Sequence, residues 1–217
     1  MGKRFTIVLA MLAFSVLFAA CSSTPSSFGR AYRGRSLDVT VKAMDRMPEL
    51  RYTNAYTDGA VDYHRLMPSG EGMELVLVRL AVANHTATSH IVDVNSQAAE
   101  LNDFFQGKYF PVDLSGQGQS WAKLDGSWAW VDNDRLTDLG EQTQGADIPM
   151  PPDWDPRSVR KIEVGINGTP PGQGFLTGSF KLDKGFSIDG WMVFETPIGT
   201  EIRSIRWRAG DSLTIPF

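Results

Sequence analysis

Apolar and polar residues alternate along several stretches of this chain, and the alternation predicts β-strands. In residues 37–44 every second side chain is apolar, so Val41 and Ala43 are expected on the same face of a strand. Within residues 72–84, positions 75–83 are apolar on both faces, apart from Arg79. Strands that are apolar on both faces are typical of the centre of a sheet with both sides covered. We therefore expect 72–84 to be a central strand.

Further short segments show the strand pattern. They are 158–167, 178–197, 200–207 and 211–217, together with two strands that flank a turn within 96–114. Helical periodicity is nearly absent, and turn residues separate the segments. This combination predicts an all-β fold, an antiparallel β-sandwich.

The stretch 184–207 leaves one question of topology open. Met192 and Phe194 are expected to point the same way, and Trp207 points inward again after a turn at Pro197 and Gly199. The pattern fits a β-hairpin, and it fits equally well a pair of sandwich strands.

Residues 115–158 differ from the rest and read as a long insertion. They are rich in Gly, Asp, Gln and Pro, and a short helix is expected around 133–143. The insertion carries four tryptophans, which are Trp121, Trp128, Trp130 and Trp154. One interpretation is that they pack over the second apolar face of 72–84. The other is that they form a surface that binds an envelope protein or a glycan, because aromatic rings anchor interfaces and stack on sugars.

The N-terminus predicts export and a lipid anchor. A short basic segment precedes the apolar run 5–20, which is shorter than the roughly 20 residues of a membrane span. The run ends in small residues followed by Cys21, an arrangement that resembles a bacterial lipobox. We expect 1–20 to be a signal peptide, Cys21 to carry lipid, and 21–36 to tether a body of residues 37–217. An ordinary secretory signal and an uncleaved anchor are the alternatives.

Composition supports the predicted export and lipid anchoring, and it excludes some functions. Cys21 is the single cysteine, so no internal disulfide can form. The formal net charge is −4, and removal of the basic signal segment makes it more negative. Binding to nucleic acid is not expected of an acidic chain. Ser22 in place of aspartate after the cysteine favours the outer membrane if the source is a diderm bacterium, with the body facing the periplasm or the cell surface.

Candidate catalytic and metal-binding residues are few. We expect the histidines, His64, His85 and His90, to be exposed loop residues without a metal. The acids Asp132, Asp134 and Asp138 lack the spacing and the glycine of a calcium loop. No nucleophile elbow, zinc-protease motif or P-loop is present. We predict no enzyme activity and no cofactor.

Several motifs together resemble a known family. These are the segments GEGMELVLVRLAVANHTATSHIVDV (70–94), GKYFPVD (107–113) and LDKGFSIDGWMVFETPIGTEIRSIRW (182–207). They resemble the immunoglobulin-like domain of unknown function in bacterial lipoproteins, which is grouped with the mycobacterial secreted immunogenic sandwich proteins. Six residues match its C-terminal motif: Gly190, Trp191, Val193, Phe194, Glu195 and Pro197.

The resemblance covers about 37–114 and 159–217, whereas 115–158 departs from the family pattern. It implies an immunoglobulin-like sandwich that serves as a binding or accessory module, and it carries over no catalytic residue. A glycan-active envelope hydrolase using acids of the insertion is one alternative, and it would need two carboxylates about 5–9 Å apart in a pocket. A structural spacer without a specific ligand is the other.

Overall fold

The computed structural model describes residues 27–55, 61–139, 148–154 and 174–217. Cys21, the signal peptide and the expected strand 158–167 lie outside these residues. Within them the chain is nearly all β with antiparallel strand pairing, which confirms the predicted fold class. In the described part of the chain, no helix is long and apolar enough to cross a membrane.

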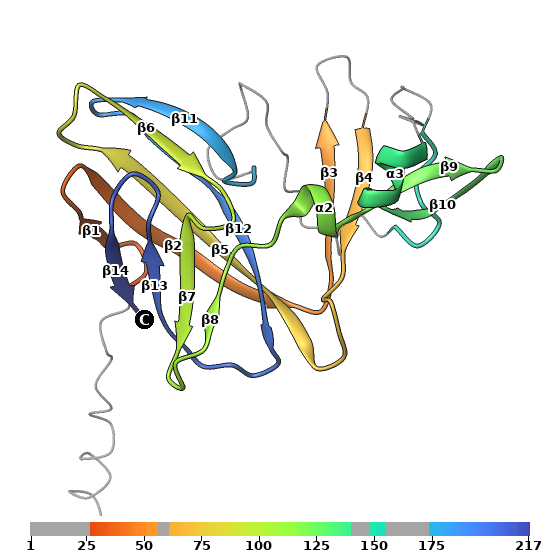
Figure 1. Ribbon diagram of the computed structural model, residues 1–217, viewed down its shortest axis with the longest axis horizontal. Helices are drawn as coiled ribbons and strands as arrows, with labels where there is room; N and C mark the ends of the chain where they lie inside the picture. Colours follow the sequence, from red (N-terminus) through yellow and green to blue (C-terminus); the bar gives the residue numbers. More distant parts are fainter. Residues whose placement is uncertain (1–26, 56–60, 140–147, 155–173) are drawn as a thin grey trace, which may run out of the picture.

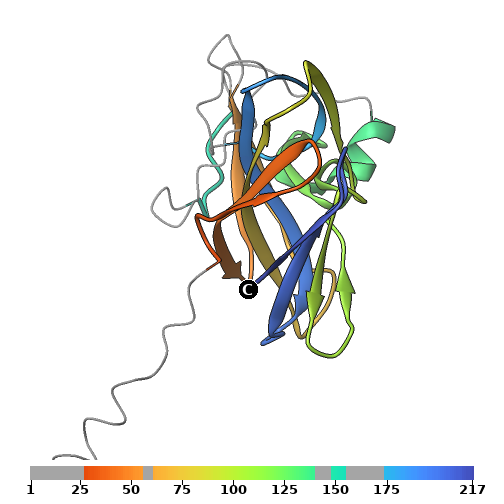
Figure 2. The same ribbon diagram turned by 90° about the vertical axis from the view of Figure 1, so that its left-hand side faces the viewer.

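The strands form two opposed layers and a third sheet beside them (Figures 1 and 2). The first layer has the order β1-β2-β5-β12, with bounds Ala31–Arg33, Leu37–Met47, Met73–Asn84 and Ser187–Pro197. The facing layer has the order β14-β13-β7-β8, with bounds Leu213–Pro216, Ile202–Trp207, Ala99–Asp103 and Lys108–Tyr109. The pair β11-β6, Gly178–Asp183 and Ser89–Val94, is a separate two-stranded sheet, and its strand β11 contacts β5 and β12 of the first layer.

The third sheet, called here the side sheet, has the order β10-β9-β4-β3. Its strands are Ser127–Asp132, Gln119–Leu124, Val61–Leu66 and Leu50–Ala55. Two short helices accompany it, α2 (Leu114–Gln117) and α3 (Asn133–Leu139). The helix expected around 133–143 is therefore confirmed over 133–139, and the two hairpins β3–β4 and β9–β10 together build the side sheet.

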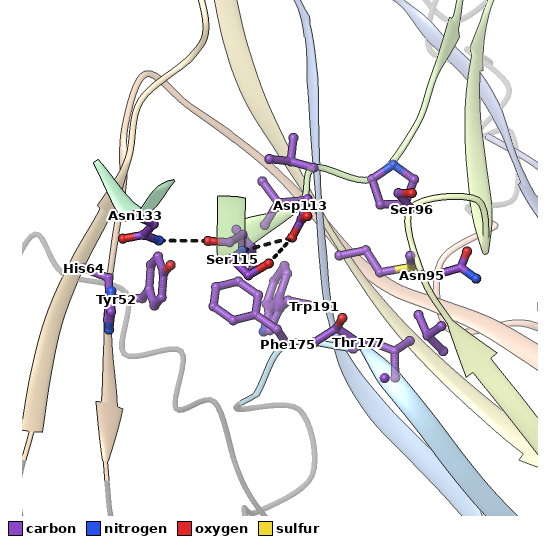
Figure 3. A pocket seen from close by; sticks show the side chains of 18 of the residues that line it. Tyr52, His64, Asn95, Ser96, Asp113, Ser115, Asn133, Phe175, Thr177 and Trp191 are labelled. Atoms are coloured by element: carbon purple, nitrogen blue, oxygen red, sulfur yellow. Dashed lines mark hydrogen bonds between the residues drawn. The ribbon is translucent and has the colours of Figure 1, made fainter. Parts of the chain in front are cut away.

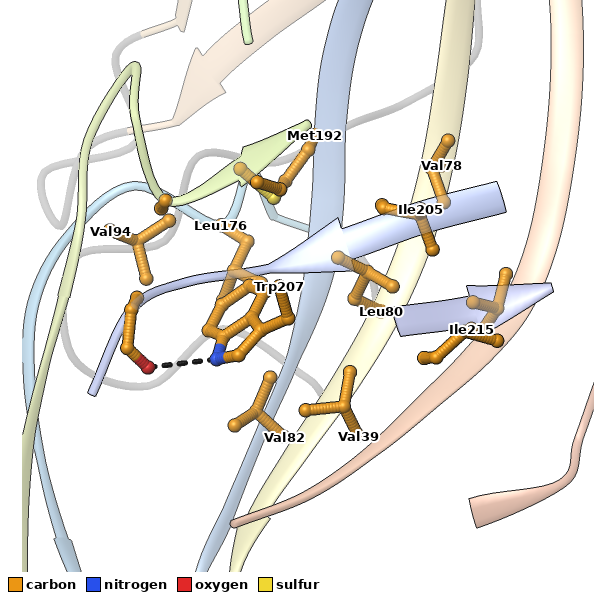
Figure 4. Packing of buried hydrophobic residues seen from close by; sticks show 14 of the residues in the cluster. Val39, Val78, Leu80, Val82, Val94, Leu176, Met192, Ile205, Trp207 and Ile215 are labelled. Carbon is orange, nitrogen blue, oxygen red and sulfur yellow. Dashed lines mark hydrogen bonds between the residues drawn. The ribbon is translucent and has the colours of Figure 1, made fainter. Parts of the chain in front are cut away.

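The central strand β5 is buried on both faces, as its sequence predicts. It pairs with β2 on one edge and β12 on the other. The face that carries Val78 and Val82 meets the facing layer in the main core around Trp207 (Figure 4). Trp207 is fully buried, and its indole Nε1 donates to the carbonyl of Ala209 at 2.8 Å. Trp207 therefore buries its ring in the core while its indole N–H keeps a hydrogen-bond acceptor.

The strands on either side of the 197–199 turn belong to different layers. β12 pairs with β5 in the first layer, whereas β13 pairs with β7 and β14 in the facing layer. Gly199 has φ +80°, and the backbone N–H of Ile198 donates to the carbonyl of Gly72. The stretch is thus a pair of sandwich strands and not a hairpin.

One detail of the predicted alternation in β2 is wrong. The register between β2 and β5 shifts between Val41 and Ala43. Val41 packs in the main core, but Ala43 packs on the opposite face of the sheet. A β-bulge adds one residue to a strand, and this reverses the faces of the residues that follow.

The second face of β5 is covered by the side sheet, but not by the tryptophans. Leu75 and Leu77 pack there with Trp191 and Val193 of β12. Their cover consists of Leu50, Tyr52, Leu66 and Phe175. Tryptophans 121, 128 and 130 are absent from this cluster, so the interpretation that they cover 72–84 is wrong. The hairpin β3–β4, which lies in sequence between β2 and β5, packs on that face instead.

Candidate functional site: the two faces of the side sheet

The side sheet separates two chemically different surfaces. Tyr52, His64 and Ser120 occupy aligned positions on β3, β4 and β9, so they share one face. Trp121 and Trp130 are register partners on β9 and β10, one residue out of phase with Ser120, so they lie on the other face. We call the latter the tryptophan face; it consists of Tyr63, Arg65, Trp121, Trp128, Trp130 and Trp154.

The four tryptophans of the insertion meet in one continuous row. Trp128 stacks on Trp121 with ring centroids 6.4 Å apart, and Trp121 meets Trp130 edge-to-face at 5.3 Å. Trp154 stacks on Trp130 at 6.3 Å and meets Tyr63 edge-to-face at 5.0 Å. Offset and edge-to-face ring contacts of this kind stabilise by about 0.5–1.5 kcal/mol each beyond the area they bury. The structure therefore brings together all the tryptophans that the sequence singled out.

Charged and amide side chains border the row. The guanidinium of Arg65 lies 4.7 Å from the ring centroid of Trp130, and its Nε donates to Gln119 Oε1 at 2.6 Å. Gln119 in turn donates to Asp132 Oδ1 at 2.7 Å. Arg51 pairs with Asp153 at 3.1 Å and fixes the segment that carries Trp154 against β3. The border is thus hydrogen-bonded and nearly balanced in charge.

Two indole donors of the row have no acceptor. The Nε1 atoms of Trp121 and Trp130 are buried, and neither has a hydrogen-bond partner in the part of the chain that the structure describes. A buried donor without an acceptor costs about 1–3 kcal/mol. The row is therefore not optimised for stability alone.

The opposite face of the side sheet carries a polar network. His64 stacks on Tyr52 with ring centroids 5.0 Å apart, and its Nδ1 lies 2.9 Å from Ser120 Oγ. Ser120 Oγ donates to Asn133 Oδ1 at 2.7 Å, and Asn133 Nδ2 donates to the carbonyl of Leu114 at 3.1 Å. Since Ser120 uses its proton toward Asn133, Nδ1 of His64 is the donor to Ser120. The network joins β4 and β9 to both short helices.

His64 is held neutral in this network. Burial lowers its pKa to about 4, and this effect outweighs the opposing charge of Asp62. The expectation that all three histidines are exposed loop residues is therefore wrong, because His64 lies on β4, His90 lies on β6, and none of the three residues is exposed. His85 lies 3.4 Å from the carbonyl of Gly34, and His90 lies on β6, so the three histidines belong to different elements.

A pocket of about 560 Å³ opens between this face and the first layer (Figure 3). Its floor is apolar and buried and includes Tyr52, Phe175 and Trp191. Its rim is polar and exposed and includes Asp93 and Asp113. The sequence did not reveal the pocket, because its walls come from seven segments that are separated along the chain.

The acids of the insertion do not gather at this pocket. Asp132 accepts from Gln119, Asp134 accepts the backbone N–H of Arg135, and the side chain of Asp138 lies outside the described residues. Among the described residues, no group of three His, Cys, Asp or Glu side chains is arranged to hold a metal ion.

Comparisons with known proteins leave the family open. No family model matches the sequence, and no curated protein matches it. One solved structure that resembles the chain is the yjhA protein from Bacillus subtilis. It is 13% identical, the match covers 85% of this chain and 84% of that one, and the TM-score is 0.41. A likeness this distant assigns neither family nor function.

Proposed function

We propose that this protein is a non-enzymatic binding module of the bacterial cell envelope, anchored through lipid on Cys21, which binds envelope glycan at the tryptophan face. The observation that supports the proposal is the continuous row of tryptophans on the face of the side sheet opposite Ser120 and His64. A row of aromatic rings with bordering hydrogen-bonding groups suits a sugar chain, because sugars offer apolar ring faces and polar edges.

The border of the row favours glycan over an envelope protein as the ligand. The charged groups nearest the rings are already paired with each other, as with Arg51 and Asp153, so they attract no strongly charged partner. Arg65 and Gln119 present planar polar groups beside the ring of Trp130. Such groups exchange hydrogen bonds with neutral hydroxyls, which is the chemistry of a polysaccharide.

A glycan-active hydrolase is supported less well. The carboxylates at the pocket are Asp93 and Asp113, and neither belongs to the insertion 115–158. Asp113 accepts hydrogen bonds from the N–H and the hydroxyl of Ser115, which lower its pKa. A general acid needs a raised pKa, so Asp113 is unsuited to that role.

Binding to purified envelope glycan tests the proposal. The mature protein would be sedimented with washed peptidoglycan sacculi and titrated with soluble glycan fragments. We expect Trp128→Ala, which removes the end of the row, to weaken binding at least tenfold. The matched control is Phe105→Ala, which removes an aromatic ring that is 87% exposed on the β7–β8 turn and should leave binding unchanged.

Three outcomes would count against the proposal. Absence of glycan binding by the unmodified protein would favour the spacer. Equal glycan binding by Trp128→Ala and the unmodified protein would show that the glycan does not bind at the tryptophan face. Retention of a protein from envelope extracts, with no affinity for glycan, would replace the glycan by a protein partner.

A further inference from the structure

The pocket between the side sheet and the first layer has the form of a small-molecule site. Ligand pockets usually have an apolar floor, a few converging polar groups and a volume of about 300–1,000 Å³. The volume here is about 560 Å³. Phe175 and Trp191 in its floor are 9% and 8% exposed. Figure 3 shows these rings between Tyr52 on one side and Asn95 with Ser96 on the other.

The floor is held rigidly by backbone pairing. The N–H of Leu176 donates to the carbonyl of Trp191 at 2.7 Å, and the N–H of Trp191 donates to the carbonyl of Gly174 at 2.9 Å. Gly190 permits this approach, because a Cβ there would lie 2.9 Å from the Gly174 carbonyl oxygen. Phe175 is thus fixed edge-on to Tyr52, with ring centroids 5.0 Å apart. The aromatic floor is preorganised for a ligand.

Tyr52 brings a polar group to this floor. The residue is 3% exposed, and burial alone raises the pKa of its hydroxyl. Its ring contacts are with His64 and Phe175, and its hydroxyl has no hydrogen-bond partner among the described residues. A ligand in the pocket would supply one.

The charge at the rim is negative and uncompensated. Asp93 and Asp113 line the pocket, and no lysine or arginine is among its described lining residues. Asp93 accepts from Ser179 Oγ at 2.9 Å, and Asp113 accepts from Ser115, but neither forms an ion pair with a described residue. His64, the remaining titratable group besides Tyr52, is neutral near pH 7.

We propose that this pocket binds a small organic cation, an amine or quaternary ammonium attached to an apolar body. The apolar body packs on Phe175 and Trp191, the positive group is attracted by ring faces and by Asp93 and Asp113, and the hydroxyl of Tyr52 accepts an N–H from the ligand. An anionic ligand is disfavoured, since it would face two carboxylates without a compensating cation. This site lies on the face opposite the tryptophan face and does not depend on it.

A series of probes with one body and different head groups tests the ligand class. The 4-phenylbutyl group would carry a primary amine, a trimethylammonium, a hydroxyl or a carboxylate. Isothermal titration calorimetry on the mature protein at low ionic strength should rank both cations at least tenfold above the carboxylate. Trp128→Ala should bind the cations as the unmodified protein does.

Charge-removing variants test the assigned residues. Asp93→Asn with Asp113→Asn keeps the shapes and removes both charges, and asparagine also caps helices well. We expect at least a tenfold loss of affinity for the cations and no loss for the alcohol. The matched control is Asp125→Asn, an exposed residue of the β9–β10 turn with φ +48°, which asparagine tolerates.

Tyr52→Phe tests the hydroxyl separately. It should weaken the primary amine, which donates N–H, more than the trimethylammonium, which has none. Thermal unfolding of each variant confirms that it is folded. Binding of none of the probes, equal binding of carboxylate and cations, or unchanged cation affinity in the double variant would each overturn the proposal. Glycan binding by the double variant shows independently whether the tryptophan face still functions.

Discussion

Mild acid should destabilise this fold through His64. In the folded protein the ring lies between Tyr52 and Ser120, and burial lowers its pKa to about 4. In the unfolded chain a histidine has a pKa of about 6.5. Between these two pKa values, His64 is protonated in the unfolded chain but neutral in the folded protein. The stabilising contribution is therefore complete above about pH 7 and is lost as the pH falls from about 6.5 to 4.

The size of the effect follows from the two pKa values. At pH 5 the unfolded histidine is almost fully protonated and the folded one is almost fully neutral. Linkage then gives a loss of about 2 kcal/mol in the free energy of unfolding between pH 7.5 and pH 5. For a domain of this size that corresponds to a fall in melting temperature of roughly 4–8 °C.

Urea unfolding at both pH values, for the unmodified protein and His64→Gln, measures this contribution. The variant is expected to be less stable at pH 7.5 because it loses the ring contact with Tyr52, but its pH dependence should be flatter by about 2 kcal/mol. Carboxylates with lowered pKa values, such as those of Asp103 and Asp211, are common to both proteins and cancel in the comparison. Parallel pH curves would refute the reasoning.

Three further predictions concern the aromatic residues, the floor of the pocket and the anchor. Trp121→Phe removes an indole N–H that has no acceptor among the described residues, whereas Trp207→Phe breaks a buried hydrogen bond. In urea unfolding, Trp121→Phe should therefore lower the free energy of unfolding by about 2 kcal/mol less than Trp207→Phe does. Equal losses of free energy in the two variants would contradict this. Gly190→Ala should destabilise by about 1–3 kcal/mol and weaken the pocket probes, because its Cβ would press on backbone; an unchanged urea midpoint and probe affinity would contradict it. Cys21→Ser should abolish palmitate labelling and release the protein from membranes, and labelling that persists would disprove the anchor.

Much of the sandwich follows from local pattern. The two apolar faces of β5 are sufficient to predict a strand at the centre of a sheet, and the turn at Pro197 and Gly199 is correctly placed. Whether β12 and β13 share a sheet cannot be read from the same pattern, because a hairpin and a change of layer both keep the same inward positions. The bulge after Val41 has no local signal either, since it is a property of the pairing with β5.

The candidate sites are harder to predict because they are assembled from distant segments. The hairpin β3–β4 was not predicted, although Leu50, Tyr52 and Leu66 show the alternation of a half-buried strand pair. Without it, neither the cover of β5 nor the position of the tryptophans can be inferred. The row itself is partly readable, since Trp128 and Trp130 fall on the same face of a strand. The contribution of Trp154 depends on the folding of a loop.

Photocrosslinking in intact envelopes tests the central claim, that the tryptophan face contacts envelope glycan, most directly. A photoreactive benzoylphenylalanine would replace Trp128 in one protein and Phe105 in another. The account predicts a high-mass adduct from position 128 alone, which disappears after digestion with glycan hydrolases. The account would be contradicted by the absence of an adduct at position 128 or by equal adducts at positions 128 and 105. It would also be contradicted by an adduct that glycan hydrolases leave intact and protease digests.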